Sequence, residues 1–237
     1  LLWYKFCLDS LLNQTFLNFE YLIIDGKSKD RTIEIVQLYE KKFENLKIPF
    51  SWVSEADDGI YEAWNKGLDR ANGDWISFLG SDDYYIPRAL EYYNRETLLL
   101  TQNYDLIYSN IKVVDGDREL RTVDGTWSWK KFRRQMNIAH VGAFHNKRFF
   151  EKYGRFNDNY KIAGDYELLL RAKSNLKTIK IEKVTANMEI GGISNNQIFK
   201  VFNETFIAKN KIGEVNYILC VYDYLITFVK YRIKYIL

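Results

Sequence analysis

Two adjacent carboxylates that follow a short apolar run are the residues of this chain best suited to chemistry. The segment 74–83 reads Asp-Trp-Ile-Ser-Phe-Leu-Gly-Ser-Asp-Asp, so the run ends directly in Asp82 and Asp83. Open α/β sheets bind ligands at the carboxyl ends of their strands, and paired carboxylates there commonly hold Mg²⁺ or Mn²⁺ on a diphosphate. Ser-Asp-Asp is also ordinary turn chemistry. This segment alone leaves a metal site and a surface turn both open.

A third acid, Asp165, follows Gly164 at the head of the apolar segment 166–170. Helix capping is one explanation for an aspartate in this place. A carboxylate in a cleft can also act as a general base and take the proton of an attacking hydroxyl. Asp165 is therefore both a candidate cap and a candidate catalytic residue.

A turn after the expected strand 20–24 contains Asp25 and Gly26 and leads through Ser28 into a helix. The N-terminus of a helix that follows such a turn is a common phosphate or nucleotide site. The same residue types also cap helices that bind nothing. Asp25 is a candidate nucleotide contact with this structural alternative beside it.

The segment 57–67 is a denser group of polar residues, Asp-Asp-Gly-Ile-Tyr-Glu-Ala-Trp-Asn-Lys-Gly. Asn65 and Lys66 could point from a helix into a shared crevice, and Asp58 precedes that helix. Apolar residues at helical spacing in the same stretch indicate a core-facing side instead: Ile60, Trp64 and Leu68.

His140 and His145 are the two histidines of the chain, in the segment Ala-His-Val-Gly-Ala-Phe-His. A histidine without a recognisable motif is usually a structural residue. Either ring could also add a nitrogen ligand to a metal or hydrogen-bond a phosphate. Both interpretations stay open.

Alternating strands and helices must position these residues. The patterns predict βαβ units and a parallel sheet in the first part of the chain, from strands at 20–24, 50–54 and 75–79 and helices at 8–16, 31–43, 60–71 and after Pro87. A different pattern follows residue 103, with a hairpin at 105–114 and 119–123, a basic aromatic stretch at 127–134 and helices at 147–153 and 165–173. A flexible turn is expected at 191–194.

Composition excludes several classes of protein. The 237 residues are 47% hydrophobic and 27% charged, which is a globular composition. The net charge of +3 argues against a dedicated nucleic-acid binder. Cys7 and Cys220 lie far apart without metal-ligand spacing, and no signal peptide is visible. We therefore expect a reduced, cytoplasmic protein.

The C-terminal stretch 216–237 is apolar but interrupted by charged residues. It is too charged for a confident membrane-spanning helix. Tyr, Phe and Ile alternating with Lys and Arg favour an amphipathic helix that lies on an anionic membrane. A helix packed on the domain is the alternative.

Taken together, these stretches resemble the family-2 inverting glycosyltransferases of the GT-A fold. The resemblance covers roughly residues 8–195 and depends on the order and spacing of several motifs. They are Leu-Leu-Asn-Gln-Thr-Phe, Tyr-Leu-Ile-Ile-Asp-Gly-x-Ser-x-Asp-x-Thr, Gly-Ile-Tyr-Glu-Ala-Trp-Asn-Lys-Gly, Gly-Asp-Trp-Ile-x-Phe-Leu-Gly-Ser-Asp-Asp, Ala-His-Val-Gly-Ala-Phe-His and Ala-Gly-Asp-Tyr-Glu-Leu-Leu-Leu-Arg.

The resemblance implies an α/β fold of the Rossmann-like GT-A type, with a mostly parallel central sheet flanked by helices and a small mixed acceptor-side region. It implies one domain over residues 1–215, with a nucleotide-binding half at 1–100 and an acceptor half at 101–215. The C-terminal helix at 216–237 would follow it.

The resemblance also implies roles for single residues. Asp25 would lie beside the nucleobase, Asp82 near the ribose and Asp83 on a Mg²⁺ or Mn²⁺ ion. Asp165 would be the general base, and His145 would lie close to the donor diphosphate.

A nucleoside-diphosphate sugar is the implied donor, with Asp58, Asn65 and Lys66 as further donor contacts. Bacterial members of this kind build exopolysaccharide, capsule or O-antigen units. The implied acceptor is thus a polysaccharide or a lipid-linked glycan. Peripheral contact with the cytoplasmic face of the inner membrane is expected.

Three departures from the family pattern are visible. The family's opening strand, which is normally central in the sheet and ends in a Tyr-Asn turn at the base, is absent. Gly80 stands where many members have the first acid of an Asp-x-Asp motif, and Gly26 stands where many have a second acid on the base.

Two competing hypotheses remain. A truncated, non-catalytic paralogue would only bind a partner or a membrane, and the absent strand motivates it. A nucleotidyltransferase also uses an α/β sheet and paired acids, but the glycine-rich basic loop that it would need is not visible.

Overall fold

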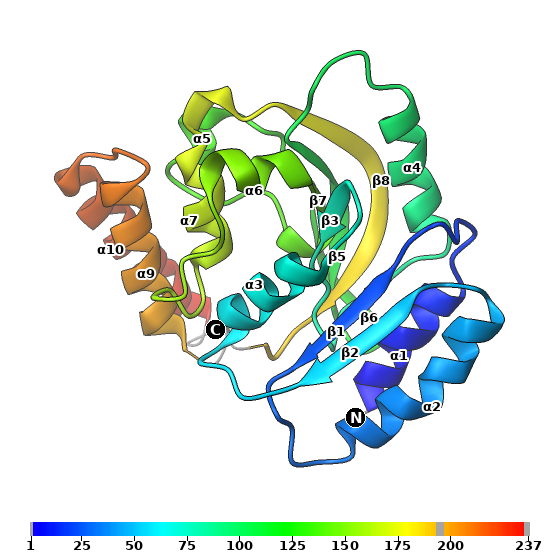
Figure 1. The fold of residues 1–237 in the computed structure, drawn as a ribbon. Helices are drawn as coiled ribbons and strands as arrows, with labels where there is room; N and C mark the ends of the chain where they lie inside the picture. Colours follow the sequence, from blue (N-terminus) through cyan, green and yellow to red (C-terminus); the bar gives the residue numbers. More distant parts are fainter. Residues whose placement is uncertain (1, 193–196, 235–237) are drawn as a thin grey trace.

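The structure is a computed structural model that describes residues 2–192 and 197–234. It contains two sheets with helices packed around them, so the predicted α/β class is confirmed (Figure 1). Of the turn predicted at 191–194, Ile193 and Ser194 lie outside the described residues.

The smaller sheet consists of two parallel strands, β1 (Tyr21–Asp25) and β2 (Phe50–Ser54), in register from the first residue to the last. Helix α2 (Thr32–Asn45) connects them and buries an apolar stripe at helical spacing: Ile35, Val36, Tyr39 and Phe43. The ring of Phe43 stacks on Phe50 with 4.6 Å between ring centroids. Because both strands run the same way, they end at one edge, where Asp25 lies opposite Ser54.

The larger sheet has the strand order β3-β7-β5-β8-β4, with β6 paired to β5. Its strands are β3 (Trp75–Ser77), β4 (Tyr84–Tyr85), β5 (Leu106–Asp115), β6 (Arg118–Val123), β7 (Ala143–Asn146) and β8 (Thr178–Glu189). Only the β5–β8 pair is parallel among the described strands of this sheet. The pairing therefore differs from the predicted mostly parallel arrangement. It differs because β7 and β8 pair antiparallel with β3 and β4 of the first half, and because β6 and β7 pair antiparallel with β5.

Helices cover both sheets. They are α1 (Leu2–Leu12), α3 (Ile60–Arg70), α4 (Ala89–Leu98), α5 (Trp129–Phe132), α6 (Lys147–Tyr153), α7 (Gly164–Arg171), α9 (Ile198–Lys211) and α10 (Tyr217–Lys234), with short 3₁₀ turns η1 (His140–Gly142) and η2 (Lys173–Asn175). The predicted bounds of β2 and α6 agree with the structure, whereas α1 ends at Leu12, before the end predicted at Phe16. The sequence patterns missed β8, β4 and α9.

Helix α1 is attached to the larger sheet through the buried side chain of Gln14, just beyond its end. Gln14 Nε2 donates to the carbonyl oxygen of Ile86 at 2.9 Å, and Gln14 Oε1 accepts the backbone N–H of Leu90 at 3.0 Å. These bonds join the first helix to the β4–α4 connection. They satisfy polar groups that would otherwise be buried without partners.

A cleft of about 1220 Å³ separates the two sheets. Strands β1 and β3 line it but belong to different sheets, so each has an unpaired edge among the described strands. Residues of α3, α1 and α4 also line it, including Trp64, Leu11 and Tyr93. The cleft therefore lies between the unpaired edges of the described strands β1 and β3.

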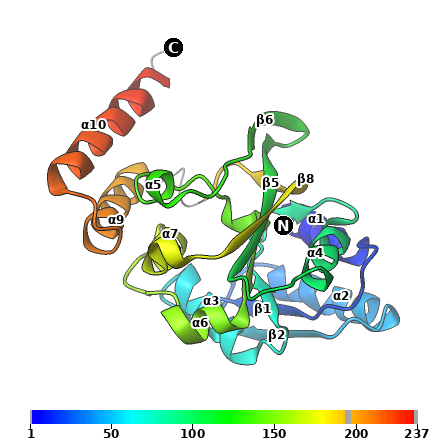
Figure 2. The same ribbon diagram turned by 90° about the horizontal axis from the view of Figure 1, so that it is seen from above.

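Helix α10 packs against α9 and projects from the body of the molecule (Figure 2). Asp223 on its inner side pairs with Arg134 and Lys209. Its outer side exposes a stripe of apolar residues: Ile218, Tyr222, Leu225, Val229 and Ile233. Among the described helices, none is long and apolar enough to cross a membrane.

Candidate active site

Asp25 lies at the carboxyl end of β1 and lines the cleft. Its carboxylate accepts hydrogen bonds from the Ser28 backbone N–H at 3.0 Å and from the hydroxyls of Ser28 and Ser54, both at 2.5 Å. Burial raises the pKa of Asp25, but these hydrogen bonds outweigh burial and hold the pKa below its ordinary value. Asp25 is thus a fixed, ionised acceptor at the edge of the sheet.

Asp57 lies directly beside this turn. A Cβ atom built on Gly26 would stand 2.7 Å from Asp57 Oδ2, so a side chain at position 26 would collide with that carboxylate. Gly26 therefore leaves room for Asp57. The residue expected from the sequence was the neighbouring Asp58. The parallel pairing of β1 and β2 is the signal that could have identified Asp57, since it brings the residues after both strands to one edge.

Asp82 and Asp83 both fold back over Gly80. A Cβ atom on Gly80 would lie 2.8 Å from Asp83 Oδ2 and 3.0 Å from Asp82 Oδ1. Asp82 lines the same cleft as Asp25, whereas Asp83 Oδ1 accepts the backbone N–H of Glu189 at 3.1 Å. Gly80 therefore leaves room for the two carboxylates as they lie here.

The two carboxylates carry unbalanced charge. Burial, followed by the charge of Asp82, raises the pKa of Asp83 to about 7. No Lys or Arg of the described chain lies within ion-pair distance of either acid. A divalent cation between them would remove the repulsion.

The donor set fits Mg²⁺ or Mn²⁺ that is shared with a phosphate ligand. No group of three or more His, Cys, Asp or Glu in the described part of the chain is arranged to hold a metal. Mg²⁺ is commonly bound by one or two carboxylates, with the remaining ligands from substrate phosphates and water. Asp82 and Asp83 match that arrangement and do not form an all-protein cage.

Asp165 lies in the first turn of α7. Its Oδ1 accepts the backbone N–H of Tyr166 at 2.8 Å and lies 3.2 Å from the Tyr61 hydroxyl. Burial raises the pKa of Asp165 to about 6. Gly164 allows this approach, because a Cβ there would lie 2.7 Å from the Tyr61 ring. A half-buried carboxylate with such a pKa can accept a proton near neutral pH.

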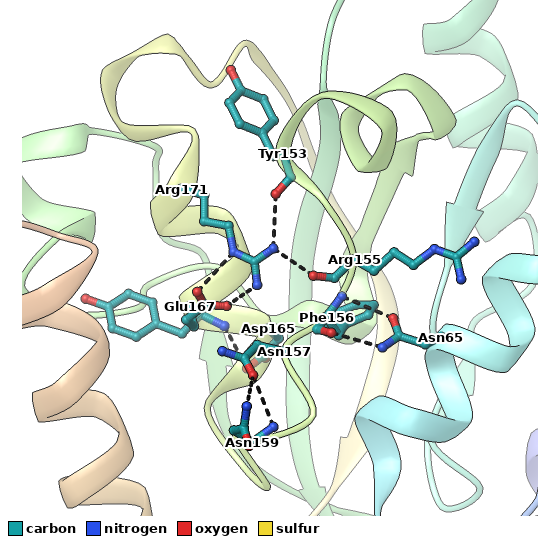
Figure 3. A network of polar contacts seen from close by, with 10 residues as sticks. Asn65, Tyr153, Arg155, Phe156, Asn157, Asn159, Asp165, Glu167 and Arg171 are labelled. Atoms are coloured by element: carbon teal, nitrogen blue, oxygen red, sulfur yellow. Dashed lines mark hydrogen bonds and ion pairs between the residues drawn. The ribbon is translucent and has the colours of Figure 1, made fainter.

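The helix that carries Asp165 is held by a polar network (Figure 3). Arg171 pairs with Glu167 at 2.5 Å, and its guanidinium donates to the carbonyl oxygens of Tyr153 and Arg155 at 3.0 and 2.7 Å. These bonds attach α7 to the loop that follows α6. The orientation of α7 is thus determined by side chains that do not line the cleft.

Asn65 takes part in the same framework (Figure 3). Its Nδ2 donates to the carbonyl oxygen of Phe156 at 2.9 Å, and its Oδ1 accepts the Phe156 N–H at 3.1 Å. Both hydrogen-bonding ends of the amide therefore bind one backbone unit. The structure places Asn65 as a bridge between α3 and the loop before α7, away from the cleft.

Lys66 and Asp58 also hold the loop before α3. Lys66 Nζ donates to the carbonyl oxygen of Ala56 at 2.8 Å and pairs with Glu55 and Glu62 at 3.3 and 3.1 Å. The backbone N–H of Asp58 donates to Glu62 at 2.7 Å. Neither residue lines the cleft that contains Asp25 and Asp82.

His145 is 0% exposed and lies in an aromatic cluster with Phe78, Phe149 and Phe150. Burial holds its pKa well below the ordinary histidine value. His140 stacks on Trp64 at 4.8 Å, and burial lowers its pKa to about 3. Both rings are therefore neutral and face the core. In this structure His145 does not reach the cleft where a diphosphate contact was expected.

The sequence matches the family described as Glycosyl transferase family 2 over residues 4–166. It is also similar to a PGL/p-HBAD biosynthesis glycosyltransferase of Mycobacterium bovis. The two are 30% identical over 215 residues, which cover 87% of this chain and 80% of that protein.

Two solved structures have a similar fold. S. aureus TarS 1-349 in complex with UDP-GlcNAc aligns with a TM-score of 0.66 and 17% identity, covering 92% of this chain and 65% of that one. Mannosyltransferase PcManGT from Pyrobaculum calidifontis, in complex with GDP-Man and Mn²⁺, aligns with a TM-score of 0.66 and 15% identity, covering 90% and 61%. This chain spans less than two thirds of either solved chain.

Proposed function

The chain belongs to glycosyl transferase family 2, and we propose that it transfers a sugar from a nucleoside-diphosphate sugar to a glycan or lipid-linked glycan hydroxyl, with inversion at the anomeric carbon. The observation that carries the proposal is that Asp25 and Asp82, which follow different strands, line one cleft. Ligands of α/β sheets bind at such an edge.

The donor nucleotide would occupy the edge formed by the ends of β1 and β2. Asp25 accepts from the base or ribose there, and Asp57 offers a second carboxylate beside Gly26. Asp82, on the opposite wall, is the acceptor for the ribose hydroxyls. Asp58, Asn65 and Lys66 hold the loops around this edge.

Asp82 and Asp83 would hold a Mg²⁺ or Mn²⁺ ion at the diphosphate. When bound, the ion neutralises negative charge on the departing nucleoside diphosphate. Of the two acids, Asp83 is the one whose position is fixed by the Glu189 backbone.

Asp165 is the proposed general base. The acceptor oxygen forms a bond to the anomeric carbon while the bond from that carbon to the diphosphate oxygen breaks. The bonding electrons leave with the nucleoside diphosphate, and Asp165 takes the acceptor proton. Attack on the face opposite the leaving group inverts the configuration. General base catalysis of this kind contributes roughly 10²–10⁴-fold in rate.

Helix α10 would bring the enzyme to a lipid-linked acceptor. Its exposed apolar stripe includes Leu225 and Val229, and Lys230 and Arg232 are exposed near its end. Such a helix suits the interface of an anionic bilayer. Sedimentation with phosphatidylglycerol vesicles tests this, and the protein should bind them more strongly than neutral phosphatidylcholine vesicles. Equal binding to both kinds of vesicle, or no binding to either, would contradict it.

The main test is a thermal-shift panel of UDP- and GDP-sugars with and without Mn²⁺. A donor that binds only the folded chain stabilises it by about 2.7 kcal/mol at a concentration of 100 Kd. Stabilisation by one donor only with Mn²⁺ supports the proposal. A panel in which no donor shifts Tm would contradict the proposal.

A further inference from the structure

A buried carboxylate on α9 binds the turn that leads into α7. Glu204 is 8% exposed, and its two oxygens accept three consecutive backbone N–H groups. Lys161 N lies 3.0 and 3.1 Å from Oε1 and Oε2, and Ile162 N and Ala163 N lie 2.8 and 2.9 Å from Oε2. Consecutive N–H groups that converge in this way form an anion-binding concavity.

The charge of Glu204 is balanced by these backbone groups. Among the side chains that the structure describes, no Lys or Arg lies within ion-pair distance of Glu204. A buried carboxylate is costly unless hydrogen bonds compensate for lost water. The three N–H groups precede the N-terminus of α7, where the helix dipole also favours negative charge. The turn and Glu204 therefore stabilise each other.

The opposite side of the same turn is bound by α3 and the loop before it. The Tyr61 hydroxyl lies 2.5 Å from the carbonyl oxygen of Ile162, and Lys161 Nζ donates to the carbonyl oxygen of Asp58 at 2.8 Å. The turn is thus held between α9 and α3. Asp165 lies two residues after Ala163, the last residue of the turn whose N–H binds Glu204.

We infer that Glu204 is a positioning residue for Asp165: its carboxylate fixes the turn 161–163 and thereby sets where the base meets the acceptor hydroxyl. This inference rests on the proposed function for the role of Asp165. The hydrogen bonds between Glu204 and the turn do not depend on the proposed function. Its negative charge also favours the protonated form of Asp165, so it strengthens the base.

Glu204→Gln is the primary variant, because it keeps the shape of the side chain but removes its charge and one acceptor. Turnover is measured as release of UDP or GDP from UDP-GlcNAc and GDP-mannose with Mn²⁺. We expect kcat to fall by roughly 10- to 100-fold, since small displacements of a catalytic group have effects of that size. The KM for the donor should stay within about twofold, because no donor contact changes.

The pH profile separates this role from a general loss of folding. Without the charge of Glu204, the midpoint of the rise of kcat with pH should move to lower pH. Glu204→Asp keeps the charge with a shorter reach, and it should recover part of the lost turnover and the wild-type midpoint. Asp105→Asn is the matched control, because it removes a carboxylate–backbone bond, to Lys177 N, far from this turn.

Hydrogen exchange provides a readout that needs no turnover. The amides of residues 161–163 should exchange roughly tenfold faster in Glu204→Gln, which corresponds to about 1.4 kcal/mol of lost protection. Unchanged exchange, or unchanged kcat with unchanged midpoint, overturns the inference. Wild-type protein that neither binds nor turns over a donor overturns the proposed function instead. Should Glu204→Gln fail to fold, Glu204→Asp takes its place, with faster exchange at residues 161–163 and a lower kcat as the criteria, because its charge keeps the midpoint.

Discussion

The carboxylate of Asp57 occupies the space into which a side chain at Gly26 would point, with Oδ2 2.7 Å from the position of a Cβ atom there. These two residues follow different strands of the smaller sheet. Their contact brings a carboxylate from the segment after β2 to the turn after β1, where many family members have a second acid.

Gly26→Ala should weaken donor binding, because the new methyl group displaces Asp57 from the Asp25 turn. The carboxylate of Asp57 is the end of a flexible side chain, so it can move aside with little loss of fold stability, and the expected loss is in donor affinity. Titration of the donor found in the thermal-shift panel measures the effect. Combined with Asp57→Ala, the methyl group should have little further cost, since the collision is removed. Additive losses in the double variant would show that the two residues do not interact.

Asp83→Asn should abolish Mn²⁺-dependent stabilisation by the donor, because it removes one of the two carboxylates of the proposed site. Without metal, the same variant should be more stable than wild type above pH 7. The folded-state pKa of Asp83 is raised from 3.8 to about 7, so the folded state keeps a proton that the unfolded state has lost, and stability falls as pH rises between these two values. Urea denaturation at pH 5 and pH 8 measures this. The exposed Asp158→Asn is the control, and equal behaviour of both variants would contradict the prediction.

Asp165→Asn should abolish sugar transfer while donor binding survives, because Asp165 does not line the cleft that contains Asp25 and Asp82. In the wild-type protein, kcat should rise as pH increases through about 6, since the carboxylate must be ionised to accept a proton. Unchanged turnover in the variant would remove Asp165 from the mechanism. A pH profile that is flat between 5 and 7 would contradict the assigned pKa.

Asn65→Ala should destabilise the fold, because it removes both hydrogen bonds to Phe156 and leaves that backbone unit without these partners. We expect a loss of about 1–3 kcal/mol in the free energy of unfolding. Donor affinity at a temperature where the variant is folded should change little. A variant of normal stability that has lost donor binding would instead support the direct donor contact expected from the sequence.

Local patterns were sufficient for elements with strong periodicity or clear boundaries. The strand Phe50–Ser54 and the helix Lys147–Tyr153 have the predicted bounds. The long strand Thr178–Glu189 was missed, because charged residues interrupt its apolar alternation and its buried and exposed residues do not alternate regularly. Its place depends on pairing with β5, which no local pattern contains.

The sequence by itself determined the family motifs and which polar residues directly follow the predicted strands. Asp25 and Asp82 could therefore be predicted to share one site, and both line the cleft. Only the tertiary structure decided which neighbouring polar groups join them. It placed Asp57 beside Gly26, turned Asn65 to the Phe156 backbone, buried His145 and brought Glu204 to the turn before Asp165. The physical reason is that the hydrogen-bond partners of a buried polar side chain determine where that side chain points. Those partners come from segments far apart in the chain, which meet only when the elements pack.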